Sequence, residues 1–485
     1  MQETGYDQLM WSGRESQELV RGGSPTSPLA DIVPLRSELA PRVDTRLFRH
    51  EFTPTWLGTA AILAGVRPPD LTRPFCATWL GCGGVYTPVV AAAVHPEANV
   101  VAWDPDPARL SMLRRIRDDA QIPNLVVHED PEPPGADRAH ASDIVVVDGL
   151  LDSVDGDRRQ QVVGSIARLL RPGGFVVASY RTVVGWGEIA PVVQVLRHFA
   201  LRSSSDPAES VASATALLAQ LSERGVRYIH ERPAVKVWLD ELVGQSPAEI
   251  VEQYVNRHLH PVSHAQIVES LSEIGATYVG SARPDPDVTV ELSQQAKNGG
   301  SESDTATVRK LIKQLRDAKS SVLAETLADL ALRRANRIDL FCLGPTPVPT
   351  RTRTVMLKRL RFSGFERHDD WAAPGPDAVA QHSSLVDALP DDSVSVAEMW
   401  PTATPRQRED HLRRALRAGI LHPAAEPPAP EALAAAPRLS AVLSSADVPI
   451  AHRCTVAPTL GSAVPLTSAP GSNTGRRRHL EGELS

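Results

Sequence analysis

Two glycines and an aspartate are spaced in this sequence as a nucleoside-binding site requires. Gly81 and Gly83 directly follow the short apolar run Phe75–Leu80 and open a stretch of small residues with a helical pattern. Glycine lets the backbone turn tightly and approach a ligand, and the amides at the start of a helix face that ligand. Asp104 ends the next apolar run about 20 residues later, where a carboxylate can accept hydrogen bonds from both hydroxyls of a ribose. The alternatives are a plain turn and a helix cap, but Asp106 is better placed as the cap.

Two further acids follow predicted strands. Asp130 comes after Leu125–Val127, where a carboxylate can meet an adenine amino group, and Asp148 closes Ile144–Val147, beside the reactive end of a bound cofactor. A solvated loop acid and a turn residue are the respective alternatives. Ligands of open α/β sheets bind at the carboxyl ends of the strands, so glycines and acids at four successive strand ends are more informative together than singly. The predicted cofactor-binding residues are Gly81, Cys82, Gly83, Asp104, Pro105, Asp130 and Asp148.

The elements that must position these residues are short apolar runs alternating with helical patterns. The predicted strands are Phe75–Leu80, Val100–Trp103, Leu125–Val127, Ile144–Val147 and Phe175–Ser179. Helical patterns, such as Asp106–Ala120 and Asp157–Leu170, separate them. Strands separated by helices of this length imply right-handed crossovers and a parallel sheet. We therefore predict an α/β, Rossmann-like domain.

The main alternative to a methyl-donor cofactor is a nicotinamide dinucleotide. Its binding motif is G-x-G-x-x-G, and Tyr86 occupies the position of the third glycine. The turn Arg171–Gly174 before the fifth predicted strand is typical of methyltransferases. These two features favour S-adenosylmethionine over NAD.

Several segments resemble bacterial class I methyltransferases that carry a methyltransferase regulatory domain, a family with protein-lysine methyltransferase-like members from rickettsiae. The segments are Phe52–Leu57, Leu80–Gly83, Leu170–Gly174, Ser179–Trp186, Tyr254–Val262 and Arg334–Leu343. The pattern Ser-Tyr-x-Thr-x-x-Gly-Trp in Ser179–Trp186 is the most specific of them, and the likeness fades after about residue 350. The resemblance implies an S-adenosylmethionine cofactor and methyl transfer to a protein, with lysine as a candidate, or to a small molecule. Asp148 and Tyr180 are candidates for steering or deprotonating an amine.

The chain departs from this family in its first motif. The family usually has an acid at the position of Trp79, where it helps to hold the methionine amino group, and Val85 replaces the last usual glycine. Two functions therefore stay open: an active methyltransferase, or a catalytically weakened relative that works as a binding or scaffolding module.

The whole chain divides into five predicted parts. Residues 1–45 form a loosely ordered segment, and residues 46–200 the S-adenosylmethionine-binding domain. Residues 201–345 form a mostly helical regulatory domain, and residues 346–425 a small winged-helix-like unit. Residues 426–485 are rich in Ala, Pro and Ser, which predicts a largely disordered tail.

Composition narrows the function classes. The net charge is -7 without a long basic segment, so the sequence gives no nucleic-acid footprint. No apolar stretch approaches the roughly 18–20 residues of a spanning helix, and no secretory leader is recognisable, so we expect a cytoplasmic protein without a membrane partner. No metal is expected, because neither the cysteines nor the nearby histidines have ligand spacing: Cys76, Cys82, Cys342, Cys454, His258, His260 and His264. The oligomeric state is left open.

Overall fold

The computed structural model describes most of the chain from residue 48 to residue 465. The described residues are 48–130, 133–134, 141–154, 156–202, 207–255, 260–283, 306, 310, 313–314, 321–332, 334–364, 393–417, 421–424, 428–445 and 454–465. The segment predicted to be loosely ordered, 1–45, lies outside them, as does His258.

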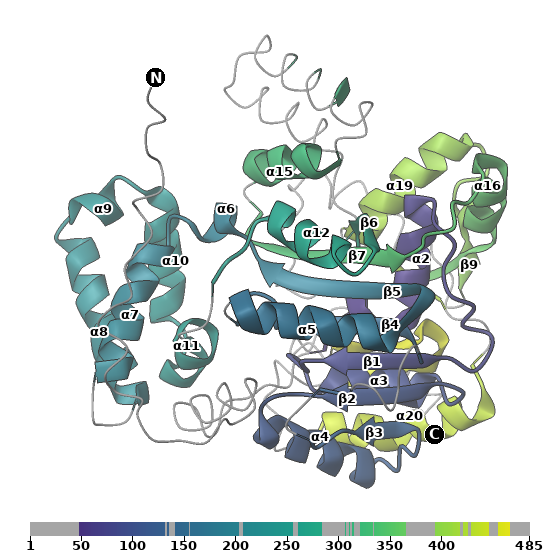
Figure 1. Ribbon diagram of the computed structural model, residues 1–485, viewed down its shortest axis with the longest axis horizontal. Coiled ribbons are helices and arrows are strands. Elements are labelled where there is room, and N and C mark those ends of the chain that lie inside the picture. Colours follow the sequence, from purple (N-terminus) through teal and green to yellow (C-terminus); the bar gives the residue numbers. More distant parts are fainter. Residues whose placement is uncertain are drawn as a thin grey trace, which may run out of the picture.

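A seven-stranded sheet with the order β3-β2-β1-β4-β5-β7-β6 forms the centre of the molecule (Figure 1). Its strands are β1 (Cys76–Leu80), β2 (Asn99–Trp103), β3 (Leu125–Val127), β4 (Ser142–Asp148), β5 (Leu170–Arg181), β6 (Ala276–Ser281) and β7 (Asn336–Leu343). The pairings among β1 to β5 are parallel, whereas β7 runs antiparallel to both β5 and β6. All five predicted strands form, and the predicted α/β, Rossmann-like fold is confirmed.

The sheet continues past the domain boundary predicted near residue 200. Strands β6 and β7 come from the range predicted to form the middle domain, and β7 pairs with β5 from Phe175 to Arg181. Six consecutive residues of β7, from Arg337 to Cys342, are buried. Side chains on both faces of β7 are therefore covered, as expected for a strand inside a sheet that has helices on both faces.

Helices cover both faces of the sheet. On one face lie α2 (Pro54–Ala64), α3 (Tyr86–Val94) and α4 (Pro107–Asp119), whose apolar residues share one core with β1 and β2. The other face carries α5 (Gly156–Leu169) and α12 (His264–Ser272). Helix α4 begins as predicted, because the Asp106 side chain accepts a hydrogen bond from the Ala108 amide at 2.9 Å. Every residue of α3 is buried, which explains its small side chains.

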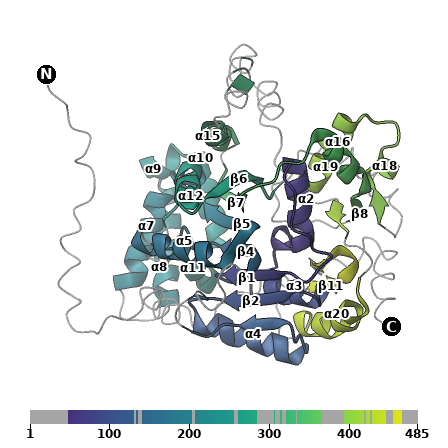
Figure 2. The same ribbon diagram turned by 45° about the vertical axis from the view of Figure 1, so that its right-hand side comes forward.

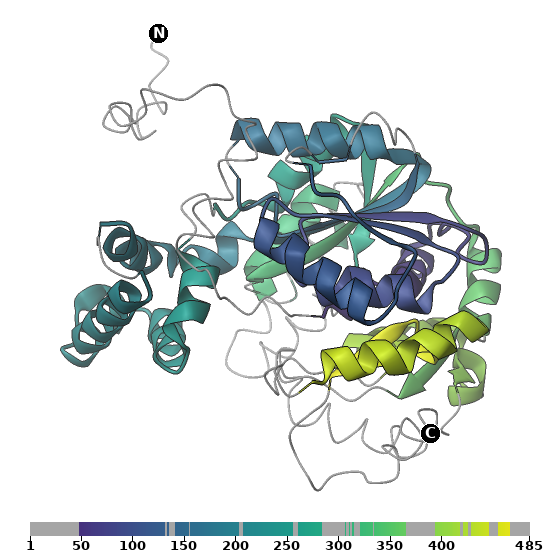
Figure 3. The ribbon, with the colours of Figure 1, turned by 90° about the horizontal axis from the view of Figure 1, so that it is seen from below.

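The prediction of a largely disordered tail is wrong for part of it. Helix α20 (Pro430–Leu443) lies outside α3 and α4 (Figure 3). It is followed by β11 (Cys454–Ala457), the 3-10 turn η5 (Pro458–Leu460) and β12 (Ser462–Pro465). Ala435, Leu439 and Leu443 join the sheet's core at helical spacing. Their spacing buries an apolar face that the high Ala and Pro content conceals.

A helical bundle follows β5 and lies at the left of Figure 1. It consists of α6 (Val183–Trp186), α7 (Ala190–Arg202), α8 (Pro207–Glu223), α9 (Arg227–His230), α10 (Pro233–Val243) and α11 (Pro247–Tyr254). Its core is separate from the two cores of the sheet and includes Trp186, Trp238 and Tyr254. Helix α15 (Ser321–Leu332) leads into β7.

A small unit follows β7 and packs on α2, which lies between it and the sheet (Figure 2). Its elements are α16 (Thr350–Arg359), β8 (Arg361–Gly364), β9 (Val394–Ser395), α18 (Val396–Met399), α19 (Pro405–Arg417) and β10 (Leu421–Pro423). The strands pair in the order β10-β8-β9. The winged-helix likeness of this unit stays a prediction.

Among the described helices, none combines the length and the apolar character needed to cross a bilayer.

An ion pair with a buried carboxylate ties the turn η2 (His50–Phe52) before α2 to the residues after β6. Arg283 donates from Nε to Oε1 of Glu51 at 2.8 Å, and Glu51 is buried. Burial raises the pKa of Glu51, but the nearby His50 and Arg283 outweigh it and lower the pKa to about 2. In the same region, Trp56 donates from Nε1 to the Ala282 carbonyl at 2.7 Å. These contacts fix the start of α2 against the sheet.

Candidate functional site

The glycine turn between β1 and α3 lies against the end of β2. Gly81 has a φ of +80°, which favours glycine, and its amide donates to the Trp103 carbonyl at 2.9 Å. The next amide, that of Cys82, donates to Oδ2 of Asp104 at 2.7 Å. The structure therefore brings the predicted turn and the predicted ribose carboxylate into direct contact.

The Asp104 carboxylate is covered by the protein's own donors. Its Oδ1 accepts from the Asp106 amide at 2.8 Å, and Nη1 of Arg109 lies 3.6 Å from Oδ2. Only 1% of the Asp104 side chain is exposed. A ligand could reach this carboxylate only if Arg109 or the glycine turn moved, and no spacing in the sequence predicts this covering.

The Asp148 carboxylate packs directly on the glycine turn from the end of β4. A Cβ atom added to Gly83 would lie 2.4 Å from Oδ2 of Asp148, so a side chain at this position displaces the carboxylate. Oδ1 of Asp148 accepts from the Ser179 hydroxyl at 2.5 Å, and Nη1 of Arg49 lies 3.3 Å away. This carboxylate is thus held between the turn, the end of β5 and the segment that precedes α2.

Neither Trp79 nor Cys82 adds a reactive group to the turn. Trp79 lies in the core that β1 shares with α2 and α3, and its indole N–H has no acceptor among the described residues. The acid usual at this position in the related family is thus replaced by an apolar side chain. Burial, followed by the nearby Asp104, raises the pKa of the Cys82 thiol well above its usual range, so the thiol stays protonated.

Asp130 is near the site through its backbone. Its carbonyl accepts from Nε1 of Trp103 at 3.0 Å, beside Asp104 in the chain. Its side chain is 78% exposed, with Nε2 of His128 3.6 Å from Oδ2. Pro105 is buried between Asp104 and the start of α4. The structure therefore brings the turn, Asp104 and Asp148 together, while the Asp130 carboxylate faces solvent.

Tyr180 lies in a buried polar network, and the structure does not bring its hydroxyl to the glycine turn. The hydroxyl donates to Oδ2 of Asp339 on β7 at 2.5 Å and lies 3.1 Å from Nδ1 of His264 on α12. Arg337 donates from Nε to the same Asp339 oxygen at 2.8 Å. Burial, followed by the Asp339 charge, raises the pKa of Tyr180 well above its usual range. This network connects β5, β7 and α12.

The segment Ser179–Trp186 forms the junction between the sheet and the helical bundle. The Thr182 side chain accepts from the Gly185 amide at 3.2 Å and donates to the Arg334 carbonyl. A Cβ atom on Gly185 would lie 2.2 Å from the Cα of Ala335. Trp186 enters the bundle core, with the Arg181 guanidinium 5.4 Å above its ring. Packing between the sheet and the bundle therefore explains most residues of the Ser179–Trp186 pattern. Ser179 is the exception, because its hydroxyl donates to Asp148.

Sequence reasoning missed Arg49 as a site residue. It lies just before the segment Phe52–Leu57 that resembles the related family, and no spacing rule singles it out. Its backbone amide donates to the Thr87 hydroxyl at 3.1 Å, at the start of α3, and its guanidinium lies 5.8 Å from the Phe52 ring. These contacts place the guanidinium at the glycine turn.

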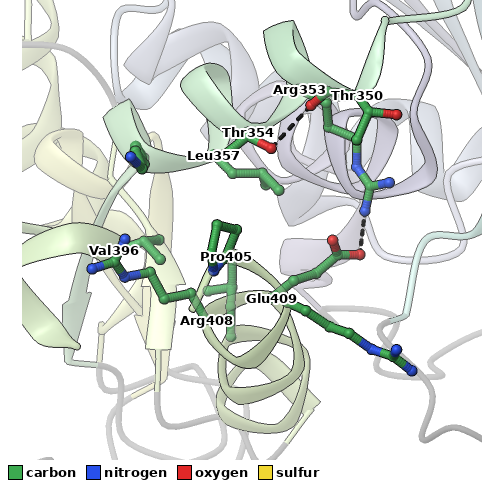
Figure 4. Close-up of a pocket in the computed structure, with 11 residues that line it drawn as sticks. Thr350, Arg353, Thr354, Leu357, Val396, Pro405, Arg408 and Glu409 are labelled. Atoms are coloured by element: carbon green, nitrogen blue, oxygen red, sulfur yellow. Dashed lines mark hydrogen bonds and ion pairs between the residues drawn. The ribbon is translucent and has the colours of Figure 1, made fainter. Parts of the chain in front are cut away.

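The small unit after β7 contains a cavity, and the elements that form it are not those of the glycine turn. It has a volume of about 230 Å³ and lies between α16 and α19 (Figure 4). Leu357 and Pro405 point into it, and the ion pair of Arg353 with Glu409 borders it.

In the part of the chain that the structure describes, no three His, Cys, Asp or Glu side chains gather as metal ligands. His264 contacts Asp339, and the His260 amide donates to the Asp152 carbonyl.

A comparison with known protein families agrees with the fold and with the glycine turn. Residues 79–178 match the family model described as a methyltransferase domain. They begin in β1 and end in β5, and so contain the turn, Asp104 and Asp148. The chain therefore carries a methyltransferase domain of the S-adenosylmethionine-dependent class.

Two proteins show how far the likeness extends. An uncharacterized protein of Synechocystis sp. is 24% identical over 318 residues, which are 65% of this chain and 60% of that protein, less than two thirds of its length. The structure of PKMT2 from Rickettsia typhi is similar with a TM-score of 0.60 at 15% identity, covering 87% of this chain and 86% of that chain. Its complex with AdoHcy has a TM-score of 0.56 at 15% identity and covers 77% of this chain and 76% of that one. At this identity the similarity to PKMT2 establishes the fold.

Proposed function

We propose that this chain is a methyltransferase that transfers the methyl group of S-adenosylmethionine to a lysine amine of a protein. The observation that carries the proposal is the extent of the likeness to PKMT2. It covers 87% of this chain and therefore extends well beyond the methyltransferase domain at residues 79–178. A shared fold does not by itself fix the acceptor, so the lysine acceptor is the part of the proposal that the labelling experiment below must test.

The residues at the turn fit the proposed cofactor. Gly83 leaves no room for a side chain beside Asp148, and the amides at the start of α3 face the turn. Gly81, Cys82 and Gly83 would support the cofactor, Asp104 would accept the ribose hydroxyls, and Asp130 would lie near the adenine. The cofactor supplies an electrophilic methyl group, and the chain contributes orientation and exclusion of water.

The two residues predicted to act on the amine differ in their surroundings. Asp148 is held against the glycine turn by Ser179, so we assign it to the cofactor side of the site. Tyr180 donates to Asp339 inside a closed network, so we assign it to positioning the end of β5. The residue that receives the proton of the acceptor amine is outside this assignment.

Transfer of a tritiated methyl group from S-adenosylmethionine to a protein acceptor tests the proposal. One acceptor sample keeps free lysine amines, and a matched sample has them blocked by acetylation, which turns each amine into an amide that no longer accepts a methyl group. We expect label only in the sample with free amines, and none with the Asp104→Ala variant, which loses the ribose ligand. Equal labelling of both samples would rule out lysine as the acceptor.

A second candidate function is a binding or scaffolding module without catalysis. The observation in its favour is Trp79, which puts a buried apolar side chain where the related family has an acid. Isothermal titration with S-adenosylmethionine separates the two. Micromolar binding favours the enzyme, and an absence of heat at millimolar cofactor favours the module.

A further inference from the structure

Two opposite charges face each other at the glycine turn. Nη1 of Arg49 lies 3.3 Å from Oδ1 of Asp148, and the second oxygen of that carboxylate packs on Gly83. The Asp148 side chain is 6% exposed, whereas that of Arg49 is 36% exposed. The carboxylate is thus fixed at the turn, while the guanidinium is at the surface and has room to change partner.

The Asp148 carboxylate is held from several sides, and the backbone of Arg49 is held beside the turn. Asp148 also accepts from the Ser179 hydroxyl at 2.5 Å, and the Gly149 amide donates to that hydroxyl at 2.8 Å. The backbone of Arg49 is tied to Thr87 at the start of α3. Groups held in place before a ligand arrives lose little conformational freedom on binding, so this pair is suited to recognition.

The polarity of the pair matches the amino-acid end of the proposed cofactor. That end carries an ammonium group and a carboxylate on the same carbon atom. Trp79 offers only an N–H donor in the core, so an acceptor for the ammonium must come from another residue. Two carboxylates contact the turn, and Asp104 is the one proposed for the ribose, which leaves Asp148 for the ammonium. Arg49 is the cation in contact with Asp148.

We infer that Arg49 and Asp148 form a charge clamp for the amino-acid end of S-adenosylmethionine, in which Asp148 accepts from the ammonium and Arg49 donates to the carboxylate. The clamp replaces the acid that the related family has at the position of Trp79. The inference rests on the proposed cofactor and names two residues of this chain that select it. Binding then separates the ion pair seen here and gives each partner a new charge-assisted hydrogen bond.

Two ligands distinguish the clamp from the rest of the site. S-adenosylhomocysteine has the amino-acid end, and 5′-methylthioadenosine has the same adenosine and a thioether without it. Isothermal titration of both ligands is carried out on the wild type and on Arg49→Met and Asp148→Asn. Arg227→Met, on α9 in the helical bundle, removes the same kind of side chain and serves as the control.

The wild type is expected to bind S-adenosylhomocysteine more tightly than 5′-methylthioadenosine. Arg49→Met and Asp148→Asn should each weaken S-adenosylhomocysteine by at least about tenfold, because each loses a charge-assisted hydrogen bond. Their affinity for 5′-methylthioadenosine should stay within about twofold, which also shows that the variants are folded. Arg227→Met should change neither affinity.

The results that would overturn the clamp differ from those that would overturn the cofactor. Equal losses for both ligands would make Arg49 and Asp148 structural residues, and unchanged S-adenosylhomocysteine binding would exclude them from the site. In either case the wild type still binds the cofactor product, and the proposed function stands. If the wild type binds neither ligand, the proposed cofactor fails and the clamp fails with it.

Discussion

Replacing Gly185 by alanine tests how the methyltransferase sheet and the helical bundle are joined. The added Cβ would lie 2.2 Å from the Cα and 2.7 Å from the backbone nitrogen of Ala335. Ordinary contacts of a Cβ atom begin near 3.4 Å, so the two segments must separate by more than about 1 Å. Both neighbours are backbone atoms, which cannot rotate away as a side-chain end can.

The cost follows from the hydrogen bonds at the same junction. Overpacking in a rigid site costs typically about 1–3 kcal/mol, and separation also lengthens the hydrogen bond from the Thr182 amide to the Ala335 carbonyl, worth about 1 kcal/mol. We therefore expect Gly185→Ala to lower the free energy of unfolding by about 2–4 kcal/mol.

Urea denaturation followed by circular dichroism measures this loss. Gly164→Ala is the matched control, because Gly164 lies inside α5 and its added Cβ would only touch the end of Arg168 at 3.7 Å. Alanine there should raise the stability by up to about 1 kcal/mol through its higher helix propensity. Equal denaturation midpoints for Gly185→Ala and the wild type would refute the packing argument.

Three further predictions follow from the contacts at the turn, at η2 and around β7. Gly83→Ala should displace the Asp148 carboxylate and weaken S-adenosylhomocysteine by more than about tenfold in titration calorimetry, a result contradicted by wild-type affinity. Because the pKa of Glu51 is lowered on folding, its carboxylate contributes stability that is fully present above pH 4.5 and is lost as the pH falls towards about 2. In urea titrations over that range, the free energy of unfolding of the wild type should fall by up to about 3 kcal/mol more than that of Glu51→Gln. Parallel curves for the two proteins would exclude this linkage. Tyr180→Phe should lower stability by about 1–3 kcal/mol, because Asp339 loses a donor, and should leave the affinity for S-adenosylhomocysteine unchanged. Loss of that affinity at full stability would instead place Tyr180 in the binding site.

The part of the fold that the sequence predicts is the part with local signals. Apolar runs separated by helical patterns locate β1 to β5, and Asp106 marks the start of α4 because its cap contact is made within three residues. The pairing of β7 with β5 joins residues more than 150 positions apart, and no local pattern specifies it. Helix α20 also depends on a long-range contact, because its apolar face packs on α3. Its high Ala and Pro content alone does not indicate this helix.

The candidate site divides in the same way. Spacing predicts that the glycine turn and Asp104 lie together, since both follow from the order of parallel strands. The orientation of a side chain depends on tertiary packing. No pattern in the sequence therefore predicts that Arg109 covers Asp104 or that the Tyr180 hydroxyl points inward. Arg49 belongs to this second group, because it reaches the turn from outside the matched domain.

A crystal structure with S-adenosylhomocysteine bound would show directly whether Asp104 and the glycine turn hold one nucleoside. We expect the ribose hydroxyls on the Asp104 carboxylate, with Arg109 moved away from it and the adenosine beside the turn at Gly81 and Gly83. A nucleoside bound elsewhere, or a ligand at the turn with the Asp104–Arg109 contact intact and the ribose bound by other residues, would contradict it.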